Sequence, residues 1–356
     1  MKIFHTAAYG PGRNGIHEAA RDMIKADCLA GHQVYFIDTG SYITGGKQNC
    51  VPIGTVDDRG GFKLVTSNPK DLGKADIIIA HQMPPYEWLA KNQAPIINIV
   101  HGRPVDSFRV EDQSINDTVS YTYMGELSQW YRVKKMVYFW PEFKPFYDTI
   151  FQEGKSEVLK YPVMDNVRFN PDGVKHIIED KNKGEFNILV CDSWSRKDID
   201  MFEIINGVIQ AGREIKNFKL HFYGVENDKD GFIPLHWDLL IKEMRKLGVM
   251  GEVHGRVLNM EEVYRSMDCV LTPHRIITRV VGESLLSGVP VIASKGCKVS
   301  QFTCDPHDPY DVARAIKDFM NSDQAQNKKN ALEQSRKFSL KNYSNEMNRI
   351  YNKIFY

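Results

Sequence analysis

Residues 278–294 read TRVVGESLLSGVPVIAS, and this stretch decides the fold of the 356-residue chain. The pattern predicts a short helix over residues 282–287 that carries Glu283 in its first turn, and Gly288 is a residue type that ends helices. The apolar run after Gly288 predicts a strand, since Pro290 is tolerated at a strand start. A helix that leads into a buried strand is half of a parallel β–α–β unit.

Short apolar runs alternate with helical patterns on both sides of this stretch. The first half predicts a helix over residues 16–30 and strands over 2–7, 33–38, 75–80 and 95–100. The second half predicts helices over 237–247, 260–267 and 282–287, and strands over 186–191, 218–223, 253–254, 269–272 and 289–293. The sequence therefore predicts an α/β protein with two Rossmann-like domains, each on a parallel sheet.

A polar stretch with proline and glycine, residues 161–183, separates the two halves. We expect an N-terminal domain over residues 1–165, a C-terminal domain over 166–335, and an amphipathic helix in 336–356 that packs back on the N-terminal domain. Doubly wound sheets bind ligands at the carboxyl ends of their strands. The expected site is a cleft between two facing sheets.

The composition gives no sign of a strongly charged, disulfide-rich, secreted or membrane-spanning protein. Lys and Arg number 46 against 45 Asp and Glu, so a net charge of +1 provides no overall attraction to nucleic acid or membranes. The six cysteines form no CxxC pair and no zinc-type spacing, which indicates reduced thiols. With no secretory signal pattern and no apolar run of roughly 18 residues, we expect a cytoplasmic protein without an integral membrane segment.

Several polar residues follow the expected strands. The loop that holds Gly12, Asn14 and Gly15 follows the first strand and opens a helix, which suits anion binding, although a plain β–α turn has the same residues. His101 and His81 each follow an apolar strand, where an imidazole can exchange a hydrogen bond with a substrate oxygen or serve a structural role.

Two further positions suit a nucleotide ligand. Arg196 and Lys197 follow the strand at 186–191, where they either hold a diphosphate or form a solvated turn. Glu283 either accepts two ribose hydroxyls or is a helix acid without a ligand.

The segment Glu283 to Ile292 resembles the pattern E-A-M-A-x-G-x-P-V-I of nucleotide-sugar glycosyltransferases with two facing Rossmann-like domains, the GT-B fold. The other landmarks of that family follow in the same order, and the resemblance covers nearly the whole chain. The matching residues are Gly15-Ile16, His101, 161–169, Tyr223-Gly224, 253–256 and 304–306. The closest family by pattern is glycosyltransferase family four, whose members retain the anomeric configuration.

The resemblance implies a nucleoside diphosphate sugar as donor, with UDP favoured, and neither a cofactor nor a metal. It implies that Glu283 binds the ribose, that Lys197 with Arg196 neutralises the departing diphosphate, and that His101 contacts the reacting sugar. Gly224 and Arg256 would border the base, and the helix start at residues 282–285 would offer backbone donors to the phosphates. The full set of expected site residues is His101, Lys197, Glu283, Gly12, Asn14, Gly15, Arg196, Gly224, Arg256, Arg275, Thr278, Arg279, Ser284 and Leu285.

Two departures from the family pattern stand out. Arg275 occupies the position where retaining members carry a second carboxylate, and Ser193 or Trp194 replaces the usual arginine before Lys197. Arg196 or Arg275 would supply the missing positive charge. The sequence pattern of residues 277–283 also resembles that of viral enzymes that glucosylate modified DNA bases with inversion.

The sequence thus predicts a glycosyltransferase that acts on a glycan, a lipid-linked sugar or a small molecule. The alternative within the same chemistry is a viral DNA glycosyltransferase that modifies hydroxymethylpyrimidines, with the aromatic and basic residues 130–140 against DNA. That stretch is equally typical of a core-facing helix and strand with solvated lysines. A catalytically inactive binding module, a phosphorylase or an epimerase on the same fold remain open alternatives.

Overall fold

The computed structural model describes residues 1–7, 15–38, 49–52, 73–82, 89–90, 92–101, 122–178, 184–192, 199, 201–224, 238–255, 257 and 259–355. These residues divide into two units. The first comprises Met1–Met164 with Ser339–Tyr356, and the second comprises Asp165–Phe338.

The first unit is built on a seven-stranded sheet with the order β3-β2-β1-β4-β5-β6-β7. Its strands are parallel except for β3, which runs antiparallel to β2 at one edge. The elements are β1 (Lys2–Ala7), α1 (Gly15–Leu29), β2 (Gln33–Asp38), β3 (Asn49–Pro52), β4 (Ile77–His81), β5 (Ile96–Val100), β6 (Val133–Tyr138), η2 (Pro141–Phe143), α6 (Lys144–Ile150), β7 (Ser156–Val158) and α13 (Leu340–Phe355).

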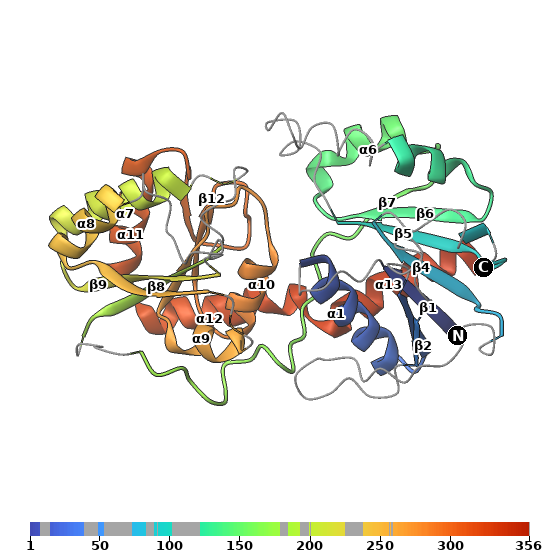
Figure 1. Ribbon diagram of the computed structural model, residues 1–356, viewed down its shortest axis with the longest axis horizontal. Helices are drawn as coiled ribbons and strands as arrows, with labels where there is room; N and C mark the ends of the chain where they lie inside the picture. The colour runs from blue at the N-terminus through green and yellow to red at the C-terminus, as the bar shows by residue number, and fades with distance from the viewer. Residues whose placement is uncertain are drawn as a thin grey trace. The chain divides into compact units, whose positions relative to one another are not determined.

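Successive residues of the central strands enter two different cores. Ile77 and Ile79 of β4 pack with α1 and α13 on one face, and Ile78 and Ala80 pack with α6 on the other. Side chains alternate between the faces of a strand, so a strand covered on both faces must be apolar throughout. This is why the central strands read as continuous Ile-rich runs, with helices on both faces (Figure 1).

The C-terminal helix α13 belongs to the first unit, and there it packs against α1. Its apolar face enters the core through fully buried Met347 and Ile350. Its polar face reaches the edge strand β7, where Arg349 Nη1 and Lys353 Nζ lie 2.7 Å and 2.8 Å from the Glu157 carboxylate. Residues far apart in the sequence therefore complete one α/β layer system.

The second unit is built on a six-stranded parallel sheet with the order β10-β9-β8-β11-β12-β13. Helices α7, α8 and α11 cover one face, and α9, α10 and α12 lie on the other (Figure 1). The elements are β8 (Phe186–Cys191), α7 (Met201–Glu214), β9 (Phe218–Tyr223), α8 (Asp238–Leu247), β10 (Met250–His254), α9 (Met260–Ser266), β11 (Cys269–Leu271), α10 (Arg279–Leu286), β12 (Val291–Ser294), β13 (Phe302–Cys304), α11 (Pro309–Met320), α12 (Gln324–Ser335) and η4 (Arg336–Phe338).

One close helix contact in this unit depends on glycine. A Cβ added to Gly207 of α7 would lie 2.5 Å from Val312 Cγ1 of α11, well inside van der Waals contact. The missing side chain lets α7 and α11 approach closely over the sheet.

The predicted α/β class with two Rossmann-like sheets is confirmed. The sequence did not indicate β3, β7 or β13, which have only three or four residues each. All three are edge strands, which carry little apolar pattern because only one strand pairs with them.

Candidate active site

Each sheet has one point where the chain reverses the direction in which strands are added. In the first unit the chain moves from β1 out to β3 and resumes at β4 on the other side of β1. In the second unit it moves from β8 out to β10 and resumes at β11 on the other side of β8. Ligands of doubly wound sheets bind beside such a switch point, at the carboxyl ends of the strands. The residues that follow β4, β8 and β11 are therefore the first candidates.

Asp192 and His274 form a hydrogen-bonded pair across the switch point of the second unit. Asp192 follows β8, His274 follows β11, and the contact joins His274 Nε2 to Asp192 Oδ2. Gly224, which follows β9, lies beside them, because its added Cβ would be 3.8 Å from the Asp192 backbone nitrogen. Gly224 has a φ of +86°, a conformation that favours glycine. The pair ties the ends of two neighbouring strands together next to the expected ligand site.

Glu283 of α10 is held from two sides. Its Oε1 accepts hydrogen bonds from Arg279 Nε at 3.1 Å and Nη2 at 2.8 Å, and its Oε2 accepts one from the Tyr264 hydroxyl of α9 at 3.2 Å. Burial, reinforced by the nearby Glu283 charge, holds the pKa of Tyr264 well above its usual value, so the phenol remains a donor. The Glu283 carboxylate is therefore held by side chains of α9 and α10. A carboxylate accepts several hydrogen bonds, which is the chemistry that a pair of ribose hydroxyls requires.

The helix that carries Glu283 begins at Arg279 and not at Gly282. The prediction that Glu283 lies in the first turn is therefore wrong, and so is the expected set of backbone donors at residues 282–285, because only the first turn of a helix has unbonded N–H groups. The physical reason is burial: Val281 is fully buried, so a helix that starts at Arg279 brings an apolar side chain into the core. Unbonded donors belong to the turn after Thr278.

The expected site residues near α10 differ in what they can reach. Thr278 Oγ1 is buried and has no hydrogen-bond partner among the described residues, so it is suited to bond a ligand. Ser284 is fully buried and its Oγ donates to the Val289 carbonyl at 2.9 Å, and Leu285 is buried as well. Arg275 is half-buried in the turn between β11 and α10. The structure brings Thr278, Arg279 and Glu283 together on one segment.

Three histidines of the first unit form one linear chain that ends at a buried carboxylate. Asp27 Oδ2 of α1 lies 2.9 Å from His5 Nε2, His5 Nδ1 lies 3.0 Å from His81 Nε2, and His81 Nδ1 lies 2.9 Å from His101 Nε2. Asp27, His5 and His81 are at most 2% exposed, and His101 is half-buried. The imidazoles stand on β1, at the end of β4 and directly after β5, so parallel pairing places them side by side.

The direction of these hydrogen bonds follows from the carboxylate. An ionised Asp27 can only accept, so His5 must donate from Nε2, which leaves His5 Nδ1 as an acceptor for His81. The same reasoning makes His81 Nδ1 accept from His101 Nε2. When all three rings are neutral, His101 Nδ1 therefore carries a lone pair. Its tautomer is set by a residue on another element, through two intervening rings.

The backbone around His101 is also fixed. Its backbone N–H donates to Gln82 Oε1 at 2.8 Å, and Asn98 Nδ2 donates to the Gln82 carbonyl at 3.2 Å. Gln82 has a φ of 60°, which is rare for a residue with a side chain. Such strain is commonly held at functional sites.

Other expected site residues cannot be placed. Gly12, Asn14, Arg196, Lys197 and Arg256 lie outside the described residues. Gly15 is the first residue of α1, so the helix after the glycine-rich loop begins where the sequence indicates.

The stretch proposed as a DNA contact has mostly internal partners. Arg132 is buried and donates to the Leu89 carbonyl at 2.7 Å, and Lys135 Nζ donates to the Gly154 carbonyl at 2.8 Å. Exposed Lys134 and Tyr131 remain at the surface of this segment. The geometry matches the core-facing interpretation for β6, with lysine stems along its edge.

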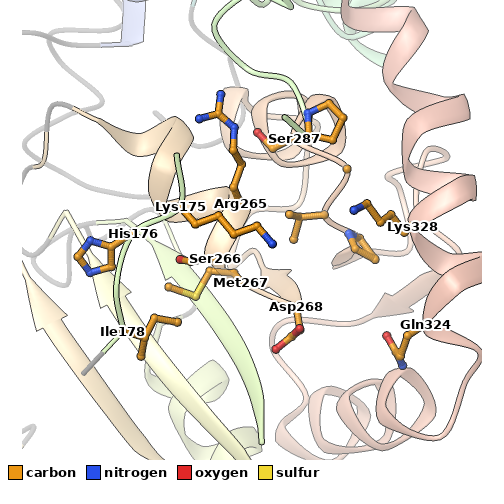
Figure 2. Close-up of a pocket in the computed structure, with 14 residues that line it drawn as sticks. Lys175, His176, Ile178, Arg265, Ser266, Met267, Asp268, Ser287, Gln324 and Lys328 are labelled. Atoms are coloured by element: carbon orange, nitrogen blue, oxygen red, sulfur yellow. The ribbon is translucent and has the colours of Figure 1, made fainter. Parts of the chain in front are cut away.

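A cavity of about 340 Å³ lies elsewhere in the second unit (Figure 2). Its lining includes Asp268 and Pro290, which immediately precede β11 and β12, so it opens at the amino ends of these strands. Lys175 and Lys328 also line it. Substrate sites of doubly wound sheets lie at the opposite edge, so the volume of this cavity does not mark the candidate active site.

Sequence reasoning missed five residues of the candidate site. Asp27, His5, Asp192, His274 and Tyr264 carry no motif, and each meets its partner only through the tertiary fold. Asp192 had one usable signal, since it directly follows an apolar strand.

The solved structures that resemble the chain include glycosyltransferases, and three of them align over 99% of its length. A sucrose-phosphate synthase from Thermosynechococcus elongatus aligns over 99% of both chains with a TM-score of 0.67 and 15% identity. The Anabaena protein HepE in complex with UDP-glucose aligns over 99% of this chain and 100% of its own, with a TM-score of 0.63 and 13% identity. A glycosyltransferase from Rickettsia africae covers 99% and 98%, with a TM-score of 0.62 and 14% identity.

The chain has the GT-B fold. This confirms the fold that the resemblance implied. No family model and no curated protein matches the sequence. Among the described residues, none of the helices of this GT-B chain combines the length and apolar character that crossing a bilayer requires.

Proposed function

We propose that this GT-B protein transfers a sugar from a UDP-sugar to an acceptor hydroxyl, with the second unit binding the donor. The observation that carries the proposal is the Glu283 carboxylate, held by Arg279 and Tyr264 beside a β-sheet switch point. Support for UDP as the nucleotide comes from HepE, which was solved with UDP-glucose.

Different residues would bind the ribose, the diphosphate and the base of the donor. Glu283 would accept hydrogen bonds from the ribose hydroxyls. Thr278 Oγ1, which has no partner among the described residues, would form a hydrogen bond with a phosphate or sugar oxygen. Lys197 with Arg196 or Arg275 neutralises the diphosphate as negative charge builds on it, so these cations act most strongly in the transition state. Gly224 and Arg256 border the base. Cations and the α10 N-terminus would neutralise the diphosphate charge, so we propose transfer without a metal. We propose retention of the anomeric configuration because of the resemblance to family four.

His101 would contact the sugar that is transferred. The chain from Asp27 makes His101 Nδ1 a hydrogen-bond acceptor when the rings are neutral, which suits a hydroxyl of the reacting sugar. A positive charge that develops on His101 would be stabilised through two rings by the Asp27 carboxylate. The acceptor would be a glycan, a lipid-linked sugar or a small molecule with a free hydroxyl.

Ligand binding tests the proposal directly. A thermal-shift screen of nucleoside diphosphates and their sugars should single out one nucleotide, because a ligand at one hundred times its dissociation constant stabilises by about 2.7 kcal/mol. Slow hydrolysis of the same donor without acceptor would distinguish an enzyme from an inactive binding module. If no nucleoside diphosphate or sugar nucleotide shifts the melting temperature, the proposal is wrong.

A DNA acceptor is the second candidate, and the exposed pair Tyr131 and Lys134 favours it. Binding to duplex DNA should then weaken steeply with salt, since each phosphate contact releases counterions. Duplex affinity that is absent at low salt eliminates this candidate and leaves the first intact.

A further inference from the structure

A second cluster of reactive side chains lies at the β10 edge of the second unit, where His254 is two residues before Arg256, which we propose borders the donor base. Glu252 and His254 are alternate residues of β10, so their side chains share one face of the strand. His176 comes from the segment that leads into β8, and its backbone N–H donates to the Glu262 carbonyl at 3.0 Å. One ligand atom from each of the three residues lies within 4.8 Å of the others.

The distances in this cluster are long for hydrogen bonds. Glu252 Oε2 lies 3.3 Å from His254 Nε2 and 3.5 Å from His176 Nε2. His176 Nε2 is buried and makes no hydrogen bond within the described part of the chain. Two ligand atoms that share a tetrahedral zinc ion with bonds of 2.0–2.2 Å lie about 3.4 Å apart. The observed separations match that spacing.

Neighbouring groups hold Glu252 and His254 in place. The Tyr223 hydroxyl donates to Glu252 Oε2 at 2.9 Å, and the Tyr223 ring packs on His254 with centroids 4.5 Å apart. The Glu252 backbone N–H donates to His221 Nδ1 at 3.2 Å, and His221 Nε2 lies 3.1 Å from Asn187 Oδ1. Partners of this kind orient metal ligands and tune their affinity.

We propose that His176, Glu252 and His254 bind one zinc ion. Two imidazoles and one carboxylate are a donor set that zinc accepts, with a fourth position left to water. All three side chains retain solvent access, so an ion can enter without opening the core. Bound zinc joins the segment that carries His176 to the edge strand β10 and covers part of that edge.

Equilibrium dialysis of the metal-stripped, full-length protein against zinc chloride tests the site. We expect one tightly bound zinc per chain, and His176→Gln or His254→Gln should weaken that binding by more than about 100-fold. His307→Gln, an exposed histidine outside the cluster, is the matched control and should bind zinc as the parent does. Tyr223→Phe should weaken binding by about 10-fold, as expected for a partner of a ligand.

Cobalt provides a second readout that does not depend on activity. Cobalt bound at this site should show the absorption of a tetrahedral ion without a thiolate charge-transfer band, because no cysteine belongs to the cluster. Circular dichroism checks that each variant is folded. Zinc that fails to bind stoichiometrically, or that binds equally well in folded His176→Gln and His254→Gln variants, overturns the proposal. Zinc binding is measured without donor or acceptor, so a failure of this proposal is distinguishable from a failure of the proposed glycosyltransferase function.

Discussion

The carboxyl edges of the two sheets are built from different chemistry. In the first unit, one buried carboxylate, Asp27, is connected through three imidazoles in line to His101. In the second unit, two separate local pairs, Asp192 with His274 and Glu283 with Arg279, hold the strand end and α10. Linked rings share their protons, so a change at one end reaches the other, whereas a local pair affects only its neighbours. Under the proposed function, the first edge would exchange a hydrogen bond or proton with the sugar and the second would hold the charged donor.

The largest expected effect is at the exposed end of the histidine chain. His101→Ala should lower sugar transfer by roughly 10²-fold or more, the usual scale for a positioned acid–base or hydrogen-bonding group. UDP binding should remain nearly unchanged, because we assign the nucleotide to the second unit. Calorimetry with UDP beside a transfer assay measures both, and His307→Ala is the control. Transfer at the parental rate would make His101 structural, and loss of UDP binding would reverse the assigned roles.

Glu283→Ala should have the next largest effect, on donor binding. Removal of the carboxylate leaves the ribose hydroxyls without partners, at a cost of about 1.5–3 kcal/mol, or roughly 10- to 150-fold in affinity. Calorimetry with UDP measures the loss, and Glu333→Ala, at an exposed position of α12, is the control. Unchanged affinity in a folded variant would remove the main support for the donor site.

Asp27→Asn tests whether the first edge acts as one linked chain. The substitution keeps the shape of the side chain and removes the charge that stabilises a proton on the rings. We expect transfer to fall by about 10-fold with UDP binding retained, a smaller loss than for His101→Ala. Nitrogen-15 NMR of the imidazoles should show altered tautomers at His81 and His101. Tautomers and transfer that both match the parent would show that the rings are not coupled.

Tyr264→Phe sharpens the comparison at the second edge, where effects should stay local. Without the hydroxyl, Glu283 Oε2 loses one donor while Arg279 still holds Oε1. Donor affinity should fall by about 0.5–1.5 kcal/mol, the usual net value of one hydrogen bond. The NMR signals of the three histidines should not change. A larger loss of affinity than for Glu283→Ala would mean that Tyr264 contacts the donor itself.

The smallest expected effect concerns stability at acidic pH, which in the second unit depends on the Asp311 carboxylate. Burial raises the pKa of Asp311, but hydrogen bonds from Lys295, the Asp305 backbone and Arg314 outweigh it and lower that pKa from 3.8 to about 2. A lowered folded-state pKa stabilises the protein above the unfolded value, and that stability is lost as the pH falls from about 4 to 2. The difference in melting temperature between the parent and Asp311→Asn should therefore shrink over this range. A constant difference would contradict the assignment.

The sequence predicted the parts of the fold that depend on local pattern. Strands β1, β2, β8 and β9 fall where apolar runs indicate them, because a strand covered on both faces must be apolar along its whole length. The start of α10 was misplaced, since Gly282 looks like a boundary and only the packing of Val281 shows that the helix begins earlier. The short edge strands β3, β7 and β13 were not predicted, because three or four residues show no clear apolar pattern.

The sequence predicted individual polar residues at the two carboxyl edges, but it did not predict which of them contact one another. Sequence alone identified His101 and Glu283 as polar residues at the right places beside apolar strands. Only the tertiary structure brought Asp27 to His5, Tyr264 to Glu283 and His176 to Glu252, because these partners come from different elements that meet when the sheets form. A periodic pattern records which face of an element is buried, whereas a hydrogen-bonded chain or a ligand cluster depends on distances that no spacing along the chain encodes. The sequence by itself therefore determined the α/β architecture and the carboxyl edges of the sheets as the place of the candidate site residues. Only the tertiary structure decided which of these side chains contact one another.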